Sequence, residues 1–580
     1  MTGTAFLGVT ASATGRRWTG PDAERMRAAE ALAQMTGRPE AVCQILARRG
    51  VAAPEVESFL APRLRDLMPD PRVLKDMQPA AARLVAAARA RQRVAVFADY
   101  DVDGGTSAAL MIRWLRHFGV DATLYVPDRI DEGYGPNAPA MTELSAGHDV
   151  IFCVDCGTLS HEALEAATVD VVVLDHHLGG ETLPRALAVV NPNRQDETGD
   201  LAHLCAAGVV FLTLVEANRQ LREAGEAGPD LIGLLDLVAL GTVADVAPLV
   251  GVNRAFVMQG LTVMARRQTP GIVALADSAR LDGAPSAHHL GFVLGPRVNA
   301  GGRVGRADLG ARLLATDDPE EAAGLAARLE DLNRERREIE AKVRAQAMAQ
   351  AEARGTDAPL VWAAGEGWHP GVVGIVASRM KEATDRPSIV IGLENGIGKG
   401  SGRSVSGIDL GSAVQRAAME GLLLKGGGHK MAAGLTVAQD RLEEAMAAIS
   451  EVLARQGAAD LGPQDLALDG VLMPAGATVD LVGAIEAAGP FGAGAPAPRF
   501  AFPSLRIQSA RQVGEGHLRV TASDGQTRIE AIAFGAFDTE LGRFVCERQG
   551  MTAHLAGRLD LNSWNGRTTV QLRLEDAAEG

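Results

Sequence analysis

The stretch 93-RVAVFADYDVDGGTSAALMIRWLRHFG-119 decides the fold of the region around it. An apolar run at 94–98 predicts a buried strand, and apolar residues recur at helical spacing over 106–118. The loop between them holds Asp99, Asp101 and Asp103. Three carboxylates at the carboxyl end of a buried strand repel one another strongly unless a cation lies between them. We therefore expect this loop to bind a pair of divalent cations.

Two other interpretations of this loop are weaker. Asp and Gly are ordinary turn residues, and D-x-D-x-D-G also resembles the start of a calcium-binding loop. A calcium loop requires Glu at its twelfth position, where this chain has Leu110, and it follows a helix rather than a buried strand. Binding of a catalytic metal remains the favoured hypothesis.

The composition is that of a globular protein with several domains. The 580 residues are 47% hydrophobic and 22% charged, with a formal net charge of −15. This acidity argues against a protein that coats nucleic acid with its whole surface, although it allows a local basic channel. We expect neither export nor a membrane span, because no stretch of about 20 apolar residues occurs.

The cysteines indicate a reducing compartment. Five cysteines spread from Cys43 to Cys546 do not form a disulfide framework, so we expect a cytoplasmic protein. Cys153 and Cys156 form a C-x-x-C pair without a second pair at zinc-finger spacing. Buried packing explains this pair better than zinc or redox chemistry does.

After residue 93 the pattern alternates between strands and helices, which predicts a parallel sheet with helices on both faces. Such sheets bind ligands beyond the carboxyl ends of their strands. The expected strands are 94–98, 122–126, 150–154, 169–174 and 188–190.

Polar residues follow three of these strands directly. The aspartates at 99, 101 and 103 follow the first, Asp155 follows the third, and Asp175, His176 and His177 follow the fourth. Asp245, at the end of an apolar helix, is a further candidate. Carboxylates with imidazole suit Mn²⁺ or Mg²⁺. A Ser, His and Asp triad is unsupported, because no G-x-S-x-G stands at a strand end.

Four segments resemble, in order, the motifs of the DHH phosphoesterase superfamily. They are DYDVDG at 99–104, VDCGT around Asp155, the triplet 175–177 and GTVADV around Asp245. Flanking stretches narrow the resemblance to the single-strand-specific 5′ to 3′ exonucleases of that superfamily, over essentially the whole chain. These stretches are 295–310, 367–380, 398–410 and 426–434. The chain departs modestly in having Val102 and Gly302 where alanine is expected.

The resemblance implies roles for residues at the motif positions. Two Mn²⁺ or Mg²⁺ ions are expected, with Asp155 bridging them. The implied metal ligands are Asp101, Asp103, Asp155, His176 and Asp245. Asp99 and His177 are implied as catalytic residues that support the metals or the phosphate.

Beyond the catalytic domain we expect one long helix over 319–353 and then a second α/β unit. The glycine-rich stretches of this unit lack the Lys then Ser/Thr of a P-loop, so ATP use is not expected. Backbone amides there could approach a phosphate, with Ser401, Arg403 and His429 as side-chain donors. The resemblance implies that Arg297, Asn299 and Arg303 face this domain and that a pocket for a 5′-terminal phosphate sets the direction of digestion.

The predicted fold class is therefore α/β, in five parts. An N-terminal helical cap, expected to pack on the next domain, precedes a DHH catalytic domain with a parallel sheet. A connecting helix, a smaller DHHA1-like α/β domain and an OB-like β-barrel follow, the barrel being a fold used for single-stranded nucleic acid. The predicted ranges are 1–90, 91–318, 319–354, 355–458 and 462–580.

The candidate ligands predict metal-dependent hydrolysis of phosphodiester bonds. The resemblance implies that the substrate is single-stranded DNA, degraded from its 5′ end to mononucleotides in repair and recombination. One alternative is a phosphodiesterase for short oligonucleotides or cyclic dinucleotides, against which the terminal barrel argues. Another is a catalytically inactive DNA-binding scaffold, against which the intact motifs argue. The resemblance implies a single-strand-binding protein and a RecQ-type helicase as partners, and a monomer is expected.

Overall fold

The computed structural model describes residues 5–129, 131–462, 464–564 and 566–580. The chain forms two compact units. One consists of Met68–Leu461, and the other combines Met1–Leu67 with Gly462–Gly580. Within the described ranges, no helix is both long and apolar enough to cross a membrane.

The first sheet of the larger unit has five parallel strands in the order β3-β2-β4-β5-β6. The strands are β2 (Val94–Ala98), β3 (Thr123–Tyr125), β4 (Val150–Val154), β5 (Asp170–Leu174) and β6 (Ala188–Val190). This arrangement confirms the predicted parallel sheet. The chain moves from β2 outward to β3 and returns to β4 on the other side of β2, so the switch point of the topology lies between β2 and β4.

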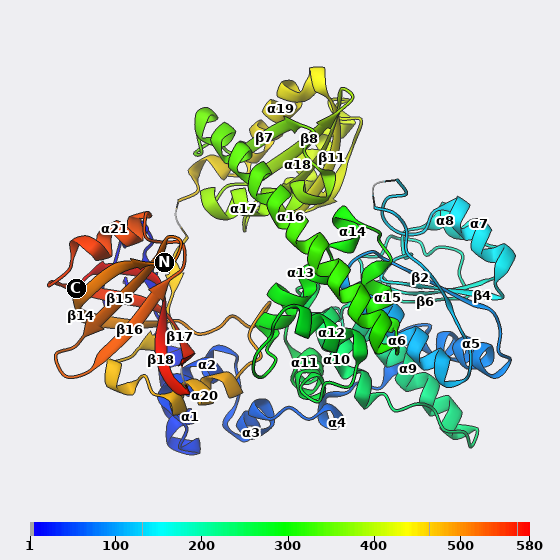
Figure 1. Ribbon diagram of the computed structural model, residues 1–580, viewed down its shortest axis with the longest axis horizontal. Coiled ribbons are helices and arrows are strands. Elements are labelled where there is room, and N and C mark those ends of the chain that lie inside the picture. The colour runs from blue at the N-terminus through cyan, green and yellow to red at the C-terminus, as the bar shows by residue number, and fades with distance from the viewer. Residues whose placement is uncertain (1–4, 130, 463, 565) are drawn as a thin grey trace. The chain divides into compact units, whose positions relative to one another are not determined.

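Helices cover both faces of this sheet (Figure 1). On one face, Phe97 and Cys153 pack with Met141 of α7 (Ala138–Gly147), and α8 (His161–Glu165) completes the layer. The helices α5 (Met77–Arg89), α6 (Val102–His117) and α9 (Ala206–Glu223) lie on the other face. Because both faces are buried, the strands are apolar throughout rather than alternating.

A helical layer extends this unit beyond the sheet. Its elements are α10 (Leu235–Ala244), α11 (Gly251–Met264), α12 (Pro270–Ser278), the π-helix η5 (His289–Leu294), α13 (Gly295–Val298), α14 (Gly301–Val304) and α15 (Leu309–Ala315). Helix α10 approaches α6 closely at Gly241, where a Cβ atom would lie 2.5 Å from Thr106 Oγ1 and 2.9 Å from Asp103 Oδ1. Glycine at this position allows α10 to bring its carboxyl end to the sheet edge.

The predicted long helix is confirmed as α16 (Pro319–Arg354), capped by Asp318, whose side chain accepts from the Glu320 amide. It leads to a second sheet with the order β10-β11-β9-β8-β7 (Figure 1). The strands are β7 (Val361–Glu366), β8 (Ser388–Glu394), β9 (Ile397–Arg403), β10 (Lys425–His429) and β11 (Ala432–Ala438). Its helices are α17 (Pro370–Thr384), α18 (Leu410–Met419) and α19 (Leu442–Arg455).

The smaller unit contains the predicted barrel. Its sheet runs β13-β14-β15-β16-β18-β17, and an additional pairing of β14 with β17 closes it. The strands are β13 (Gly470–Val471), β14 (Phe500–Val513), β15 (His517–Ser523), β16 (Arg528–Ala533), β17 (Thr552–Trp564) and β18 (Arg567–Glu579), with helices α20 (Val479–Ala487) and α21 (Glu540–Glu547). These strands confirm the predicted OB-like barrel.

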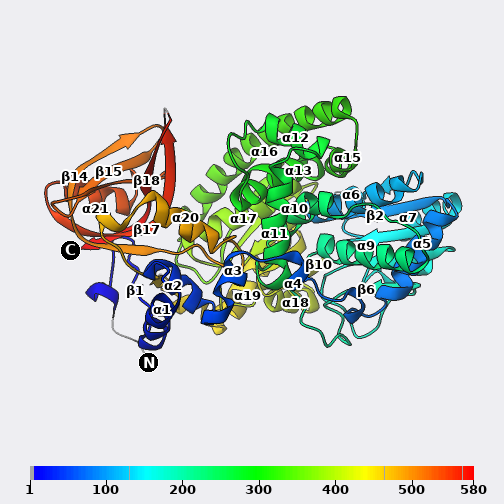
Figure 2. The ribbon, with the colours of Figure 1, turned by 90° about the horizontal axis from the view of Figure 1, so that it is seen from below.

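The N-terminal segment is divided differently from the prediction. Helix α5 packs on the first sheet, but Met1–Leu67 belong to the barrel unit rather than to the following domain. Strand β1 (Trp18–Thr19) pairs in parallel with β12 (Leu466–Ala467), and Figure 2 shows α1 (Ala23–Thr36) and α2 (Glu40–Arg48) near the barrel strands. The short helices α3 (Val56–Leu60) and α4 (Leu64–Leu67) follow.

Buried polar contacts explain this assignment. Trp18 is fully buried and donates from Nε1 to Asp576 Oδ2 at 2.9 Å. Arg48 Nη1 binds Asp469 Oδ1 at 2.6 Å, and Asp469 is 3% exposed. A buried carboxylate is stable only with such a partner. The N-terminal segment therefore supplies donors that the C-terminal unit requires.

Replacing Trp18 with Phe keeps an aromatic ring but leaves Asp576 with an unpaired buried oxygen. We expect Trp18→Phe to lower the free energy of opening of β17 and β18 by about 2 kcal/mol, measured by hydrogen exchange with mass spectrometry. Trp114→Phe is the matched control, because Trp114 Nε1 donates to Asn218 in the other unit at 2.9 Å. Unchanged exchange of β18 in Trp18→Phe would contradict the assignment.

Candidate metal centre

The aspartates after β2 are held by the starts of two helices. Asp101 caps α6, because its Oδ1 accepts from the amides of Asp103 at 2.8 Å and Gly104 at 3.1 Å. Asp103 reaches across to α9 and accepts from the amides of Ala206 and Ala207 at 2.6 and 2.9 Å. The first turns of two helices thus fix two carboxylates and favour their negative charge.

Asp155 occupies the end of the neighbouring strand, on the other side of the switch point. Its backbone is left-handed, with φ of 62°, and the residue is 1% exposed. Asp99, at the end of β2, is 4% exposed. Oδ1 of each residue is buried and has no hydrogen-bond partner in the described part of the chain. Native proteins seldom leave such oxygens unpaired, and a bound cation would satisfy both.

In the triplet after β5, Asp175 has a different role from the two histidines that follow it. Asp175 accepts from the amides of Thr158, His176 and His177, and it binds His177 Nδ1 at 2.8 Å. Its oxygens are therefore occupied by protein donors. Asp175 acts as a support that orients the two histidines.

His176 lies at the centre of the remaining carboxylates. Its Nε2 is 3.3 Å from Asp155 Oδ1 and 3.8 Å from Asp103 Oδ2, and its Nδ1 is 3.8 Å from Asp245 Oδ2. Asp245 is placed by the carboxyl end of α10. Four separate segments thus deliver donors to one point.

The donor atoms form three overlapping groups, each within 4.8 Å. The groups are Asp99, Asp101 and Asp155; Asp103, His176 and Asp245; and Asp155, His176 and His177. All seven residues expected at the metal centre are brought together. Asp155 and His176 each belong to two groups, and the mixture of carboxylate oxygen with imidazole fits Mn²⁺ or Mg²⁺.

The pKa values of the carboxyl groups reflect how closely these groups are buried together. Burial, and then the charge of Asp101, raise the pKa values of Asp99 and Asp155 well above the usual carboxyl range. Burial together with Asp103 and Asp101 raises the pKa of Asp245 to about 8. Each carboxyl is thus poised to hold a proton when no cation is present.

The pair of Asp175 and His177 behaves in the opposite way. Burial opposes ionisation of both groups, but their mutual hydrogen bond, their opposite charges and the other nearby donors and carboxylates together outweigh it. The pKa of Asp175 falls below its usual range, and that of His177 rises to about 9. This pair is an ion pair at neutral pH.

Several supporting residues were not predicted from the sequence. The Tyr134 hydroxyl donates to the Asp155 carbonyl at 3.1 Å and lies 3.0 Å from His177 Nδ1. Asn191 Nδ2 donates to the His177 carbonyl at 2.8 Å, and Asn193 Nδ2 donates to the His176 carbonyl at 2.6 Å. These residues lie in loops and have no recognisable spacing. Only the Asn-Pro-Asn stretch after β6 could have drawn attention to the asparagines.

A cationic cluster lies next to the carboxylates. Arg303 Nη1 donates to the Gly371 carbonyl at 3.0 Å, at the first turn of α17. Arg403 Nη2 and Ser401 Oγ lie 3.2 and 3.3 Å from the position of a Cβ atom on Gly374, one turn further along α17. Two predicted arginines and the predicted serine therefore converge on one helix start, where anions are favoured.

Arg129 joins this cluster and was not predicted. Its guanidinium lies 5.0 Å from the centre of the Tyr100 ring. Burial and the charge of Arg129 lower the pKa of Arg303 to about 10, and the same two causes lower that of Arg403. None of the three arginines forms an ion pair with a carboxylate in the described ranges. Like charges held together in this way favour a phosphate between them.

The other three predicted substrate residues are placed differently. Arg297 does not join the cluster, because its Nε binds Glu330 and its Nη1 donates to the Val293 carbonyl. His429 is exposed on the edge strand β10, in the cross-strand row that contains Arg403. Asn299 is half-buried just after α13.

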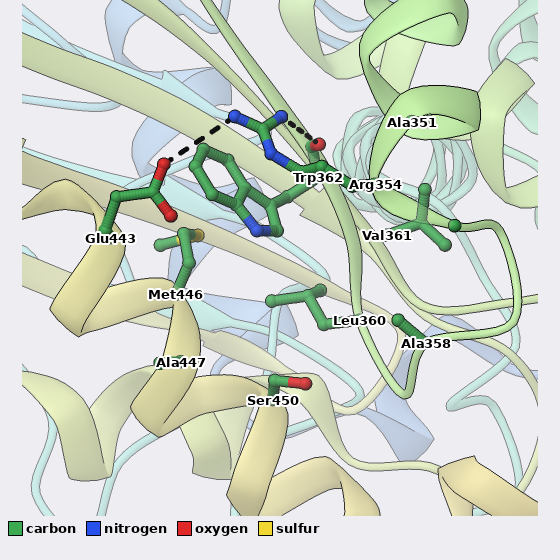
Figure 3. A pocket seen from close by; sticks show the side chains of 11 residues that line it. Ala351, Arg354, Ala358, Leu360, Val361, Trp362, Glu443, Met446, Ala447 and Ser450 are labelled. Carbon is green, nitrogen blue, oxygen red and sulfur yellow. Dashed lines mark hydrogen bonds and ion pairs between the residues drawn. The ribbon is translucent and has the colours of Figure 1, made fainter.

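A pocket of about 230 Å³ elsewhere in the second α/β domain is a separate feature (Figure 3). The Arg354 guanidinium lies 3.9 Å from the centre of the Trp362 ring and 3.7 Å from Glu443. Its positive charge is thus already paired, and no donor of the metal centre lines the pocket.

The fold and the donor set define a DHH phosphoesterase. The DHH family N-terminal domain matches residues 93–242, and the DHHA1 domain matches 357–455. The RecJ OB domain matches residues 468–576. The chain belongs to the RecJ family of single-stranded-DNA-specific exonucleases.

Individual relatives support this membership. The chain is 38% identical to the single-stranded-DNA-specific exonuclease RecJ of Dickeya dadantii over 93% of this chain and 96% of the relative. It is 37% identical to that of Escherichia coli, over 87% and 90%. The crystal structure of RecJ from Thermus thermophilus in complex with Mn²⁺ matches with a TM-score of 0.80 at 31% identity, covering 97% of this chain and 79% of that one. A complex of that protein with Mg²⁺ is also known.

Metal binding should displace protons from these carboxyls. With a pKa of about 8, Asp245 holds a proton at neutral pH without a cation, and Mn²⁺ requires the ionised form. We expect the affinity for Mn²⁺ to rise between about pH 6 and about pH 8 as this carboxyl loses its proton. Calorimetry in two buffers of different ionisation enthalpy measures the protons released. Binding without proton release would contradict the crowded carboxyl cluster.

Proposed function

We propose that this chain hydrolyses single-stranded DNA from its 5′ end and releases mononucleotides, using two divalent ions, Mn²⁺ or Mg²⁺. The observation that carries this proposal is the convergence of seven donor residues around two unpaired buried oxygens at the carboxyl edge of a parallel sheet. When bound there, divalent ions lower the pKa of water and stabilise charge on a scissile phosphate. The names of the relatives support the choice of substrate.

The proposed ligands are Asp101, Asp103, Asp155, His176 and Asp245. Asp155 is proposed to bridge the ions, because it contributes to two of the donor groups. Asp99 also offers an unpaired oxygen to this cluster, and we propose that it supports the metals or accepts a proton from the attacking water. His177 is proposed to donate a hydrogen bond to the phosphate, since Asp175 keeps its ring protonated and Tyr134 restrains it.

We propose that the direction of digestion comes from the cationic cluster at the start of α17. Arg129, Arg303, Ser401 and Arg403 would bind the terminal 5′-phosphate. The neighbouring carboxylates and His176 would hold the ions that favour hydrolysis of the first phosphodiester bond. In that reaction water would bond to the phosphorus, and the 3′ oxygen of the released nucleotide would leave. Asn299 and His429 remain proposed contacts to the strand. Arg297 also remains a proposed contact to the strand, with its guanidinium bonded to Glu330.

The barrel unit is proposed to hold the strand beyond the cleaved nucleotide, as OB folds bind single strands. A single-strand-binding protein and a RecQ-type helicase remain proposed partners. A monomer remains the proposed state.

The function is tested with one single-stranded oligonucleotide labelled in turn at its 5′ and 3′ ends. With Mn²⁺ or Mg²⁺ we expect immediate release of the 5′ label as mononucleotide, none with EDTA and none from a blunt duplex. Asp155→Asn, which suits the left-handed backbone, should lose activity by at least about 10²-fold while remaining folded. Release of the 3′ label first would contradict the proposed polarity, and cleavage of very short oligomers alone would favour a small-substrate phosphodiesterase.

The phosphate site is tested by comparing strands that carry a 5′-phosphate or a 5′-hydroxyl group. We expect the wild type to prefer the phosphate and Arg403→Ala to lose that preference, by about 10-fold or more for a charge-assisted contact. Mn²⁺ binding should be unchanged. Arg416→Ala is the matched control, because Arg416 is exposed and bonded to Glu420. An equal preference in Arg403→Ala and wild type would contradict the assignment.

A further inference from the structure

An aromatic pair is exposed on the helical layer of the larger unit. Phe292 is 73% exposed, although large aromatic side chains are usually buried. The imidazole of His288 stacks on it, with ring centres 5.0 Å apart and planes inclined by 23°. Aromatic residues make up only 4% of this chain, so a stacked and exposed pair calls for an explanation.

The backbone presents this pair outward. Phe292 lies in the π-helix η5, a conformation that is rare and frequent at functional sites. Leu290 and Leu294 on either side are fully buried and anchor the turn. The exposure of Phe292 is therefore imposed by a fixed turn rather than by a loose surface loop.

The turn packs directly on the segments that carry the metal-centre carboxylates. A Cβ atom on Gly291 would lie 3.3 Å from Val243 Cγ1, and one on Gly295 would lie 3.4 Å from Ala244 Cβ and 3.9 Å from Val102 Cγ2. Val243 and Ala244 immediately precede Asp245, and Val102 stands between Asp101 and Asp103. The turn that carries the aromatic pair is thus packed on segments that carry metal-centre carboxylates.

We propose that Phe292, backed by His288, is a stacking platform for one nucleobase of the substrate strand. This inference rests on the proposed function and assigns a positioning role to Phe292. A flat ring binds any base through its π face, as a sequence-independent exonuclease requires. The turn packs on the segments that carry the proposed metal ligands, so the substrate strand is the occupant consistent with the site. Stacking one base fixes where the adjacent phosphodiester lies.

The platform is tested with strands that carry one abasic residue at successive positions from the 5′ end. We expect the wild type to slow at one position, where the missing base would have stacked on Phe292. Phe292→Ala should digest the intact strand about tenfold more slowly and show no position of abasic sensitivity. Phe292→Trp should keep the sensitivity. A merely structural role of Phe292 would not remove the dependence on a base.

The control variant is Met419→Ala, which truncates an apolar side chain that is 81% exposed at the end of α18. It should retain the abasic profile of the wild type. Stabilisation by Mn²⁺ in thermal unfolding shows that Phe292→Ala is folded. If Phe292→Ala slows at the same abasic position as the wild type, the platform is overturned. If the wild type digests no strand at all, the proposed function fails instead, and the two failures are thereby distinguished.

Discussion

The structure depends on the burial of carboxylates that repel one another. Asp99, Asp103 and Asp155 are all buried, and Asp99 and Asp155 lie within one cluster with Asp101. Burying several like charges costs several kcal/mol for each ion unless opposite charge compensates them. The protein reduces this cost with amides at the starts of α6 and α9, but two oxygens remain unpaired. The fold thus holds a crowded cluster of carboxyl groups whose natural complement is a cation.

The parallel sheet makes this concentration of charge possible. Strands β2 and β4 flank the switch point, and the carboxyl ends of strands at a switch point are where sheets of this kind bind ligands. The glycine at 241 lets α10 add Asp245 from the helical layer. The cationic cluster at the start of α17 provides charge of the opposite sign beside the same edge. The metal centre and the cationic cluster would each stabilise the negative charge of one phosphate, on either side of the nucleotide that is released.

The sequence predicted much of this arrangement, because the motif residues follow apolar strands directly and parallel strands end at one edge. The sequence also predicted the long helix and the barrel, because apolar residues recur regularly along these elements. The two-residue pairing of β1 with β12 joins segments about 450 positions apart and leaves no periodic signal. Arg129 and Tyr134 lie in an irregular loop, and the pairing of Arg297 with Glu330 depends on the packing of α16. Such contacts arise from tertiary structure alone.

The most direct test of the anionic centre is a crystal structure of the wild-type chain soaked in Mn²⁺, with data collected at the manganese absorption edge. We expect two anomalous peaks among Asp101, Asp103, Asp155, His176 and Asp245, with Asp155 contacting both. A single peak would contradict the bridging role of Asp155. The absence of any peak at these residues would contradict the claim that the buried carboxylates are held together for divalent cations.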